Sequence, residues 1–442
     1  MLRLIRITLL AATAMTGPVM AKDYFLASGR WDNVVLVIDL EKAIDPANDG
    51  TPNAVVNRLR VTPDIQVDGQ TQIASGQPII VTIAPDHQRA YISNHSGQTP
   101  AAEAEEFQHG HAGSVTVVDL TKALDPEANE TLHAVQGWID SQGFGATGFA
   151  LLPGGTHAAL AHAEAEGFED GGHHINIIDL AAGKVTHRVA QAVGSGEGCP
   201  PTELARSAPD PRFGCYPDTN GVTASPLGGP QGLIFTANGG SNDVSVIDIQ
   251  RALAAEDGAE IGRIPVQAGG FGITTSPDGK LVAHASREDP RDGREANTIS
   301  IIDVEKAGAD PASAEVARIR VGTDDANEPS RPFVAAFTPD GTQIVTTNFR
   351  TNNIDIIDVG RAVAGQDATV ARIPLETGSD DPSRPRGIAI TPDGQYAAIT
   401  GAPPKNGPNS SMVWIVDLKQ HKPVGRVTQI GSESYMIGHF AQ

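Results

Sequence analysis

The chain repeats one short strand motif seven times, and this repeat limits the fold more than any other feature. Each copy is a run of mostly β-branched residues that ends in an aspartate and an apolar residue. Successive aspartates lie 80, 60, 69, 55, 55 and 59 residues apart, slightly more than one four-stranded propeller blade. Seven copies therefore predict an all-β, seven-bladed β-propeller. The copies are VVLVIDL (34–40), SVTVVDL (114–120), HINIIDL (174–180), DVSVIDI (243–249), TISIIDV (298–304), NIDIIDV (353–359) and MVWIVDL (412–418).

Six of the repeats follow a hairpin whose turn is rich in proline, aspartate and glycine, such as TPDGQYAAITG at 391–401. These residues supply turn dihedrals between two short strands. Each blade thus reads as strand A, turn, strand B, variable loop, strand C with the repeat motif, and strand D. The repeated aspartates occur once per blade, so we interpret them as caps of the turn after strand C, not as catalytic groups.

The two ends of the chain are predicted to close the ring. The first unit has no hairpin, and its strand at 23–28 enters directly from the N-terminal side. The segment 434–440 follows the last D strand and has no other strand to pair with. Pairing the two within blade 1 removes exposed sheet edges. We therefore expect a single domain over 22–442.

The first 21 residues have the pattern of an export signal. Arg3 and Arg6 precede an apolar run from Ile7 to Met15, and small residues lead to Ala21, where cleavage is expected. No other stretch approaches the roughly 18 apolar residues of a membrane helix. We expect a periplasmic or secreted protein without membrane insertion.

The chain is acidic, with 53 Asp and Glu against 32 Lys and Arg and a net charge of −21. Such a surface repels nucleic acid and anionic membranes, and it attracts cations. The two cysteines, Cys199 and Cys215, lie in an insertion at 191–219 that is rich in proline and charge. In an oxidising compartment they are expected to form a disulfide, with a metal-binding thiol pair as the alternative. No CxxCH motif occurs, so covalent haem is not expected.

The blade sequence resembles a known repeat family. A PDG turn, a strand ending as in YISN or TTN, and a VSVID strand are similar to the YVTN family of β-propeller repeats of exported and surface-layer proteins. The resemblance covers nearly all of 22–442 and implies a propeller, but no activity, because the signature residues build blades. Bacterial lactonases, the heavy subunit of methylamine dehydrogenase and periplasmic zinc-chaperone propellers are similar in architecture, and none offers a motif that can be transferred here.

One face of the predicted propeller carries the long insertions. D-to-A connections and B-to-C loops surround the channel mouth on this face, which we call the top face. Loops longer than a hairpin on one side of a rigid scaffold are where binding tends to occur. The insertions are 62–77 and 191–219 between strands D and A, and 95–113, 163–173 and 287–297 between strands B and C.

Two of these loops, on blades 2 and 3, are rich in histidine and acid. Imidazole and carboxylate groups are ligands for Zn²⁺ or Cu²⁺. Because no fixed ligand spacing such as HExxH occurs, a solvated acidic loop with incidental histidines is the alternative. The candidate metal ligands are His95, Glu105, Glu106, His109, His111, His162, Glu166, Asp170, His173 and His174.

Blades 5 to 7 bring arginines to the same face. Arginines at a channel mouth can clamp a carboxylate or phosphate, but acids lie beside them, so pairing between loops is the favoured interpretation. The arginines are Arg287, Arg331, Arg350, Arg384 and Arg386, and the acids are Glu288, Asp289, Asp324, Asp325, Asp380 and Asp381.

Three functions remain open at the level of sequence. The leading hypothesis is an exported, non-catalytic propeller that captures a divalent metal (Zn or Cu), or a metal-dependent ligand, for handover to a periplasmic protein partner. The alternatives are a propeller enzyme, either a lactonase-like hydrolase or a quinoprotein dehydrogenase-type subunit, and a plain envelope scaffold. No Ser-His-Asp order, nucleophile elbow or phosphate-binding glycine loop identifies catalytic residues.

Overall fold

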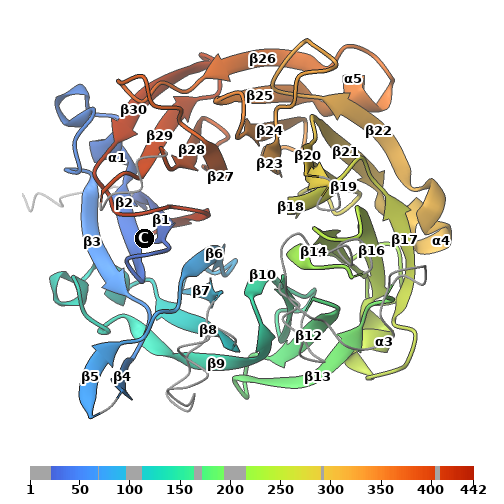
Figure 1. Ribbon diagram of the computed structural model, residues 1–442, viewed down its shortest axis with the longest axis horizontal. Coiled ribbons are helices and arrows are strands. Elements are labelled where there is room, and N and C mark those ends of the chain that lie inside the picture. Colours follow the sequence, from blue (N-terminus) through green and yellow to red (C-terminus); the bar gives the residue numbers. More distant parts are fainter. Residues whose placement is uncertain are drawn as a thin grey trace, which may run out of the picture.

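The computed structural model describes residues 21–67, 69–95, 112–163, 172–193, 216–289, 293–403 and 409–442. Seven antiparallel sheets are arranged in a ring, each with one strand at the centre and its neighbours following outwards (Figure 1). The predicted seven-bladed β-propeller is therefore confirmed.

The blades are built from consecutive strands, apart from blade 1, which takes its innermost strand from the C-terminus. From the centre outwards, blade 1 contains β31 (Ile437–Ala441), β1 (Asp23–Gly29), β2 (Val34–Asp39) and β3 (Val55–Arg60). Blade 2 contains β6 (Pro78–Ile83), β7 (Arg89–Asn94), β8 (Ala112–Asp119) and β9 (Val135–Phe144). Blade 3 contains β10 (Ala146–Leu151), β11 (His157–His162), β12 (His174–Asp179) and β13 (Lys184–Ala190). Blade 4 contains β14 (Thr219–Ser225), β15 (Leu233–Asn238), β16 (Asp243–Asp248) and β17 (Glu260–Pro265). Blade 5 contains β18 (Gly269–Thr275), β19 (Leu281–Asp289), β21 (Thr298–Asp303) and β22 (Glu315–Arg320), and the short strand β20 (Arg294–Glu295) pairs with β19. Blade 6 contains β23 (Pro332–Phe337), β24 (Gln343–Asn348), β25 (Asn353–Asp358) and β26 (Thr369–Pro374). Blade 7 contains β27 (Pro385–Ile390), β28 (Tyr396–Gly401), β29 (Met412–Asp417) and β30 (Lys422–Val427).

Short helical turns follow most of the C strands. They are α1 (Leu40–Ala43), η1 (Pro46–Asn48), η2 (Lys122–Leu124), η3 (Pro126–Ala128), α3 (Ile249–Leu253), α4 (Val304–Ala309), η4 (Pro311–Ser313) and α5 (Val359–Val363).

The ring closes by pairing of the two ends of the chain, as predicted. Strand β1 pairs antiparallel with β31, and Tyr24 lies opposite Phe440. The two rings stack with their centroids 5.5 Å apart, and Phe440 is fully buried. This pairing covers an edge of β1 that would otherwise expose unpaired backbone groups.

The repeated aspartates are structural, as predicted. Asp39, Asp248, Asp303 and Asp358 cap α1, α3, α4 and α5, and each accepts a backbone N–H three residues further on. The remaining three accept backbone N–H groups of the turn after strand C, and they are Asp119, Asp179 and Asp417. A cap of this kind contributes about 1 kcal/mol, which explains one copy per blade.

The signature asparagines at the ends of three B strands also build blades. Asn94 donates to Ser114 and Thr116 on the neighbouring C strand, at 3.0 and 2.9 Å. Asn238 and Asn348 make equivalent bonds in blades 4 and 6. Apolar residues of neighbouring blades fill the interfaces between the sheets.

Of the predicted insertions, the one at 62–77 is largely described, whereas most of the one at 191–219 lies outside the described residues. The insertion at 62–77 contains a hairpin, β4 (Asp64–Val67) and β5 (Gln70–Ile73), that was expected only as a long loop. Cys199 and Cys215 lie outside the described residues, so the disulfide stays a prediction, and the same holds for the export signal at 1–20. Within the described parts of the chain, no helix is long and apolar enough to cross a membrane.

Candidate functional site

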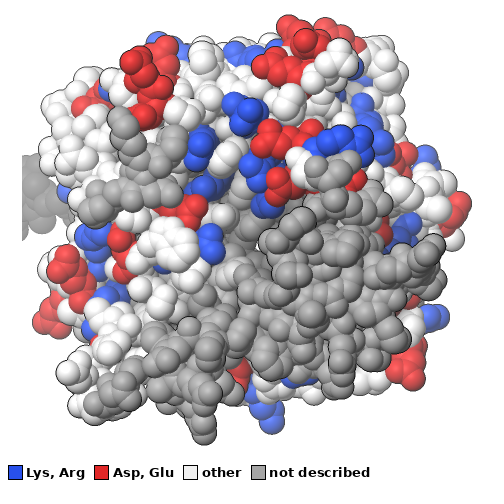
Figure 2. All heavy atoms as spheres, in the orientation of Figure 1, with Lys and Arg blue, Asp and Glu red and all other residues white. Residues whose placement is uncertain are grey.

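Arginines gather around the channel mouth on the top face. Figure 2 shows this face, with basic side chains around the hollow near its centre and acidic ones between them. Most of these arginines come from D-to-A connections and B-to-C loops of blades 1, 5, 6 and 7. We call them the mouth arginines: Arg30, Arg287, Arg331, Arg350, Arg384 and Arg386.

Two of the mouth arginines are held in an unusual backbone conformation. Arg331 and Arg384 have positive φ angles of 51° and 48°, and each directly precedes the proline that opens strand A of its blade. A residue before proline normally adopts an extended conformation, so this arrangement costs about 1–3 kcal/mol. Neighbouring blades maintain it, because the Arg331 N–H donates to the Ala296 carbonyl at 2.8 Å and the Arg384 N–H donates to Asn352 Oδ1 at 3.0 Å.

Three guanidinium groups surround the ring of Phe349. The Cζ atoms of Arg331, Arg384 and Arg386 lie 5.1, 5.6 and 5.5 Å from its centroid. No two of these atoms can therefore be more than about 11 Å apart. Cation–π contacts contribute about 0.5–2 kcal/mol each. They do not remove the repulsion between three like charges in a partly buried place.

Glu288 lies between two of the mouth arginines. Its carboxylate accepts a short hydrogen bond from Arg287, and its Oε2 is 2.6 Å from Nη2 of Arg331. Burial alone would raise the pKa of Glu288, but the two guanidinium groups outweigh burial and hold this pKa below its usual range. Glu288 therefore stays ionised and neutralises one charge of the cluster.

Two further glutamates pair with the mouth arginines. Glu295 is 3.2 Å from Arg331 and 3.7 Å from Arg350. Glu433 is 2.9 Å from Arg386 and 3.5 Å from Arg30. Five of the six mouth arginines thus pair with three glutamates, so arginines outnumber their carboxylate partners here in a chain of net charge −21.

Arg386 differs from the other mouth arginines because it is almost fully buried and only part of its guanidinium group has a hydrogen-bond partner among the described residues. Only 7% of the side chain is exposed, and Nη2 donates to Glu433. Its Nε and Nη1 are buried and have no hydrogen-bond partner among the described residues, and Nε of Arg331 is in the same situation. A buried donor without a partner costs about 1–3 kcal/mol, and more when the group is charged. Such a donor needs an acceptor, which a buried water or a bound anion can supply.

Aromatic rings fill the channel beside the arginines. Phe271 of blade 5 lies 4.7 Å from Phe333 of blade 6, and Tyr435 of blade 1 lies 5.7 Å from both, measured between centroids. They belong to a cluster that also includes Ile79 and Ile388. The mouth arginines therefore lie beside an apolar cluster.

A cavity of about 160 Å³ adjoins the cluster between blades 3, 4 and 5. Its wall includes Arg287 and Glu288 and the backbone of four glycines. A Cβ atom on Gly269 would collide with the carbonyl group of Gly239, so the cavity wall requires glycine there. The complete lining is Ala163, Asp218, Asn220, Gly239, Gly240, Gly269, Gly270, Arg287 and Glu288.

The structure brings the predicted arginines together and adds one that sequence reasoning missed. Arg331, Arg350 and Arg386 pair with carboxylates of other segments, in line with the favoured interpretation. Arg287 instead pairs with the adjacent Glu288 of its own strand β19, and Arg384 has no carboxylate partner among the described residues. Arg30 was missed because it lies on blade 1, far from the others in sequence. Its position in a B-to-C turn is the signal that could have identified it.

The partners of these arginines were predicted only in part. Glu288 is one of the expected acids, but Glu295 and Glu433 were not expected. Asp324 instead pairs with Arg372 on the outer strand β26.

The histidine sector on blades 2 and 3 is described only in part. The rings of His173 and His174 lie 4.1 Å apart, His162 is fully buried at the end of β11, and His95 follows β7. The other six candidate ligands lie outside the described residues: Glu105, Glu106, His109, His111, Glu166 and Asp170.

Where the structure is described, the side chains close enough to share a metal ion are Asp125, Glu127 and His133, on the outer surface of blade 2. This group includes none of the predicted ligands. The metal site at the top face therefore stays a prediction.

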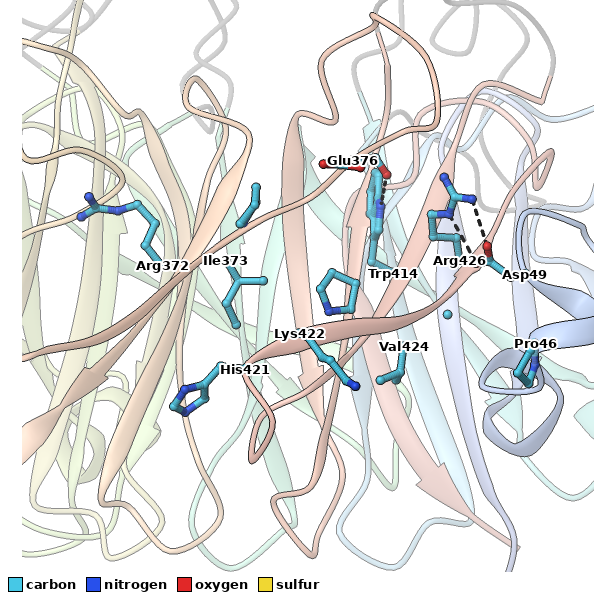
Figure 3. Close-up of a pocket in the computed structure, with 13 residues that line it drawn as sticks. Pro46, Asp49, Arg372, Ile373, Glu376, Trp414, His421, Lys422, Val424 and Arg426 are labelled. Atoms are coloured by element: carbon cyan, nitrogen blue, oxygen red, sulfur yellow. Dashed lines mark hydrogen bonds and ion pairs between the residues drawn. The ribbon is translucent and has the colours of Figure 1, made fainter.

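A larger cavity of about 760 Å³ lies on the side of the ring, along the outer strands β26 and β30 (Figure 3). Two of its polar side chains are paired within the protein. Arg426 points to Asp49 and pairs with it at 3.0 Å, and the buried indole of Trp414 donates to the carbonyl of Glu376 at 2.8 Å. We call this cavity the side groove, and nothing in its lining requires a ligand.

The likeness to known proteins is structural. No protein-family model matches the chain, and no curated protein matches it. The YVTN resemblance is therefore not confirmed by a family model.

Solved structures are similar to the chain. The periplasmic gluconolactonase of Pseudomonas aeruginosa is 15% identical with a TM-score of 0.57, covering 95% of this chain and 99% of that one. Hydrazine synthase of Kuenenia stuttgartiensis is 21% identical with a TM-score of 0.51, covering 80% and 78%. A functionally unknown protein from Desulfotomaculum acetoxidans is 12% identical with a TM-score of 0.58, covering 95% and 98%. At these identities the likeness shows the propeller fold alone.

Proposed function

We propose that this protein is an exported binding propeller that holds a small organic anion, a carboxylate or a phosphate, at the mouth of its channel. The observation that carries the proposal is the buried guanidinium of Arg386, whose Nε and Nη1 have no partner among the described residues. Arg331 and Arg384 converge on the same ring as Arg386. An anion would satisfy these donors and relieve the repulsion between the guanidinium groups.

The charge at the mouth favours an anion over a metal ion as the ligand of this part of the top face. Six arginines against three glutamates leave an excess of positive charge, which repels cations. The strained backbone of Arg331 and Arg384 also fixes the cluster in advance, so little ordering is needed when the anion binds.

Calorimetry with acetate, sulfate and methyl phosphate tests the proposal. At least one of these anions should bind wild-type protein, and Arg386→Met should weaken that binding by about tenfold to a hundredfold, the value of one or two charged hydrogen bonds. Arg426→Met removes an arginine that is paired in the side groove and should leave the affinity unchanged. Absence of binding to all three anions, or equal weakening by both variants, would exclude an anion site at the mouth.

Lactone hydrolysis is a second candidate, supported by the carboxylate of Glu288 at the wall of the 160 Å³ cavity beside Arg287. An ionised carboxylate can accept a proton from water, and a guanidinium can stabilise the oxyanion that forms on the lactone carbonyl. The name of the similar Pseudomonas protein, a gluconolactonase, points to the same chemistry. The low pKa of Glu288 weakens it as a base, so we rank this candidate second.

Titration of the acid released from a panel of lactones tests the second candidate. Wild-type protein should release acid above the uncatalysed rate, and Glu288→Gln should lower kcat by at least about a hundredfold. Unchanged turnover in this variant would exclude Glu288 as the base. If no lactone is hydrolysed, binding is the remaining function.

Export is the part of the proposal that rests on the N-terminal pattern alone. Sequencing of the mature protein should find Lys22 at its N-terminus. An intact N-terminus at Met1 in protein from the periplasm would contradict cleavage after Ala21.

A further inference from the structure

Cations and aromatic rings alternate across the channel mouth in one continuous stack. Cζ of Arg30 lies 4.6 Å from the ring of Trp31 and 5.3 Å from the ring of Tyr435. Cζ of Arg386 lies 4.4 Å from the ring of Tyr435 and 5.5 Å from the ring of Phe349. The stack therefore runs from blade 1 to blade 6 and ends at the proposed anion site.

Trp31 at the outer end of the stack is exposed. Half of its surface (50%) is accessible, and Arg30 covers part of its ring. The other two tryptophans, Trp138 and Trp414, each donate their Nε1–H to a backbone carbonyl. Trp31 has no such bond among the described residues. An exposed indole on a rigid turn beside an anion site offers a flat apolar surface to a ligand.

Arg30 is held rigidly between the two rings. Its Nε and Nη2 donate to Oε1 of Gln77 at 3.1 and 2.9 Å, and its Nη1 is 3.5 Å from Glu433. These bonds fix the guanidinium plane, so the indole that rests on it is fixed too. Pre-organised stacking surfaces lose little entropy when a ring binds to them.

We infer that the anion bound at the mouth carries a planar ring, which stacks on the exposed part of Trp31 while its charged group is held by Arg386. This inference rests on the proposed anion site and adds the class of ligand. The centroid of Trp31 and Cζ of Arg386 are at most about 14 Å apart along the stack. A ring that is joined to a carboxylate or phosphate through a linker can span a separation below this upper limit.

Two matched pairs of phosphate esters test the inference by calorimetry. Adenosine 5′-monophosphate is compared with ribose 5-phosphate, and phenyl phosphate with methyl phosphate, because each pair differs by the ring alone. In at least one pair the compound with the ring should bind about tenfold more tightly, the value of one stacking contact. The same compound should quench the fluorescence of the exposed tryptophan.

Variants separate the inference from the proposal on which it rests. Trp31→Ala should remove the ring advantage and leave the affinity for methyl phosphate unchanged, whereas Arg386→Met should weaken binding of both members of a pair. Ile73→Ala changes an equally exposed apolar residue (52%) on the β5 hairpin and should preserve the ring advantage. Equal affinities within both pairs, or a ring advantage that survives Trp31→Ala, would overturn the inference and leave the anion site standing. Failure of all four esters to bind while acetate or sulfate binds would overturn the inference and leave the anion site standing, and failure of acetate and sulfate as well would overturn both.

Discussion

The channel mouth and the side groove are built from the same residue types, but they balance charge differently. In the side groove Arg426 pairs with Asp49, and Arg372 pairs with Asp324 and Asp355. At the mouth arginines outnumber carboxylates, and Arg386 keeps buried nitrogens without a partner in the described structure. Paired charges thus connect blades in both regions, and the partly satisfied arginine at the mouth is the basis of the proposed anion site.

The largest expected effect is a difference in the free energy of unfolding between an arginine variant in the side groove and one at the channel mouth. Arg372→Met should lower the free energy of unfolding by about 3 kcal/mol, because it leaves the fully buried carboxylate of Asp355 without its cation. Arg386→Met removes a charge from a cluster with excess positive charge and should change the stability by less than about 1 kcal/mol. Urea denaturation of both variants measures the difference. Equal losses would break the comparison, since Arg386 would then be a structural cation.

The histidine sector of the top face is expected to bind a metal cation, in contrast to the arginine cluster at the mouth, which is proposed to bind an anion. We expect mature protein to bind about one Zn²⁺ or Cu²⁺ through this sector, and replacement of His109, His111, His173 and His174 by alanine to weaken binding by at least about a hundredfold. Calorimetry at pH 7.5 provides the measurement.

The choice of control matters for the metal experiment. His133 lies within reach of two carboxylates that could hold an ion, so it is unsuitable as a control, and His187 on strand β13 is preferable. Equal metal affinity in wild type and in the fourfold variant would refute the predicted site.

His284 is a buried side chain in strand β19 that, like Arg386, has polar atoms without a partner among the described residues. It is fully buried in β19 opposite Ser300, and neither ring nitrogen has a partner in the described structure. Burial lowers its pKa to about 3. The unfolded chain therefore binds a proton below about pH 6.5 while the folded protein does not, and stability is lost between pH 6.5 and 3. At pH 5 the loss is about 2 kcal/mol relative to pH 7.5.

A threonine variant isolates this effect. Thr236 and Thr346 occupy the equivalent position in blades 4 and 6, so His284→Thr fits the same strand register. The variant should lose about 2 kcal/mol less than wild type between pH 7.5 and 5, measured by urea denaturation. Identical pH profiles would show that His284 finds a hydrogen-bond partner, such as a buried water.

The smallest expected effect concerns the pH dependence of anion binding. Guanidinium groups and sulfate keep their charges between pH 5.5 and 8, and the pKa of Glu288 is held below its usual range. The affinity for sulfate should change by less than about twofold over this interval, in contrast to metal binding by imidazole, which should weaken below about pH 6. A step in sulfate affinity near pH 6 would place a histidine in the anion site.

Much of the blade structure could be predicted because it depends on local patterns. The VxVID strands and their capping aspartates repeat in every blade and the turn signals in six of them, and each needs only its neighbours in sequence. Closure of the ring followed from an excess strand at one end and a missing strand at the other.

The site could not be assembled from the same patterns. Arg30 and Glu433 are 403 positions apart and meet only because blade 1 joins the two ends of the chain. Whether all donors of an arginine find acceptors depends on burial and on carboxylates from other segments, because Arg372 pairs with two aspartates whereas Arg386 pairs with Glu433 through Nη2 alone among the described residues. The sequence by itself determined the number of blades, the order of strands and the face with the long loops, since these arise from short-range periodicity. Only the tertiary structure decided which charges meet, because electrostatic interactions depend on distance and solvent exposure in space.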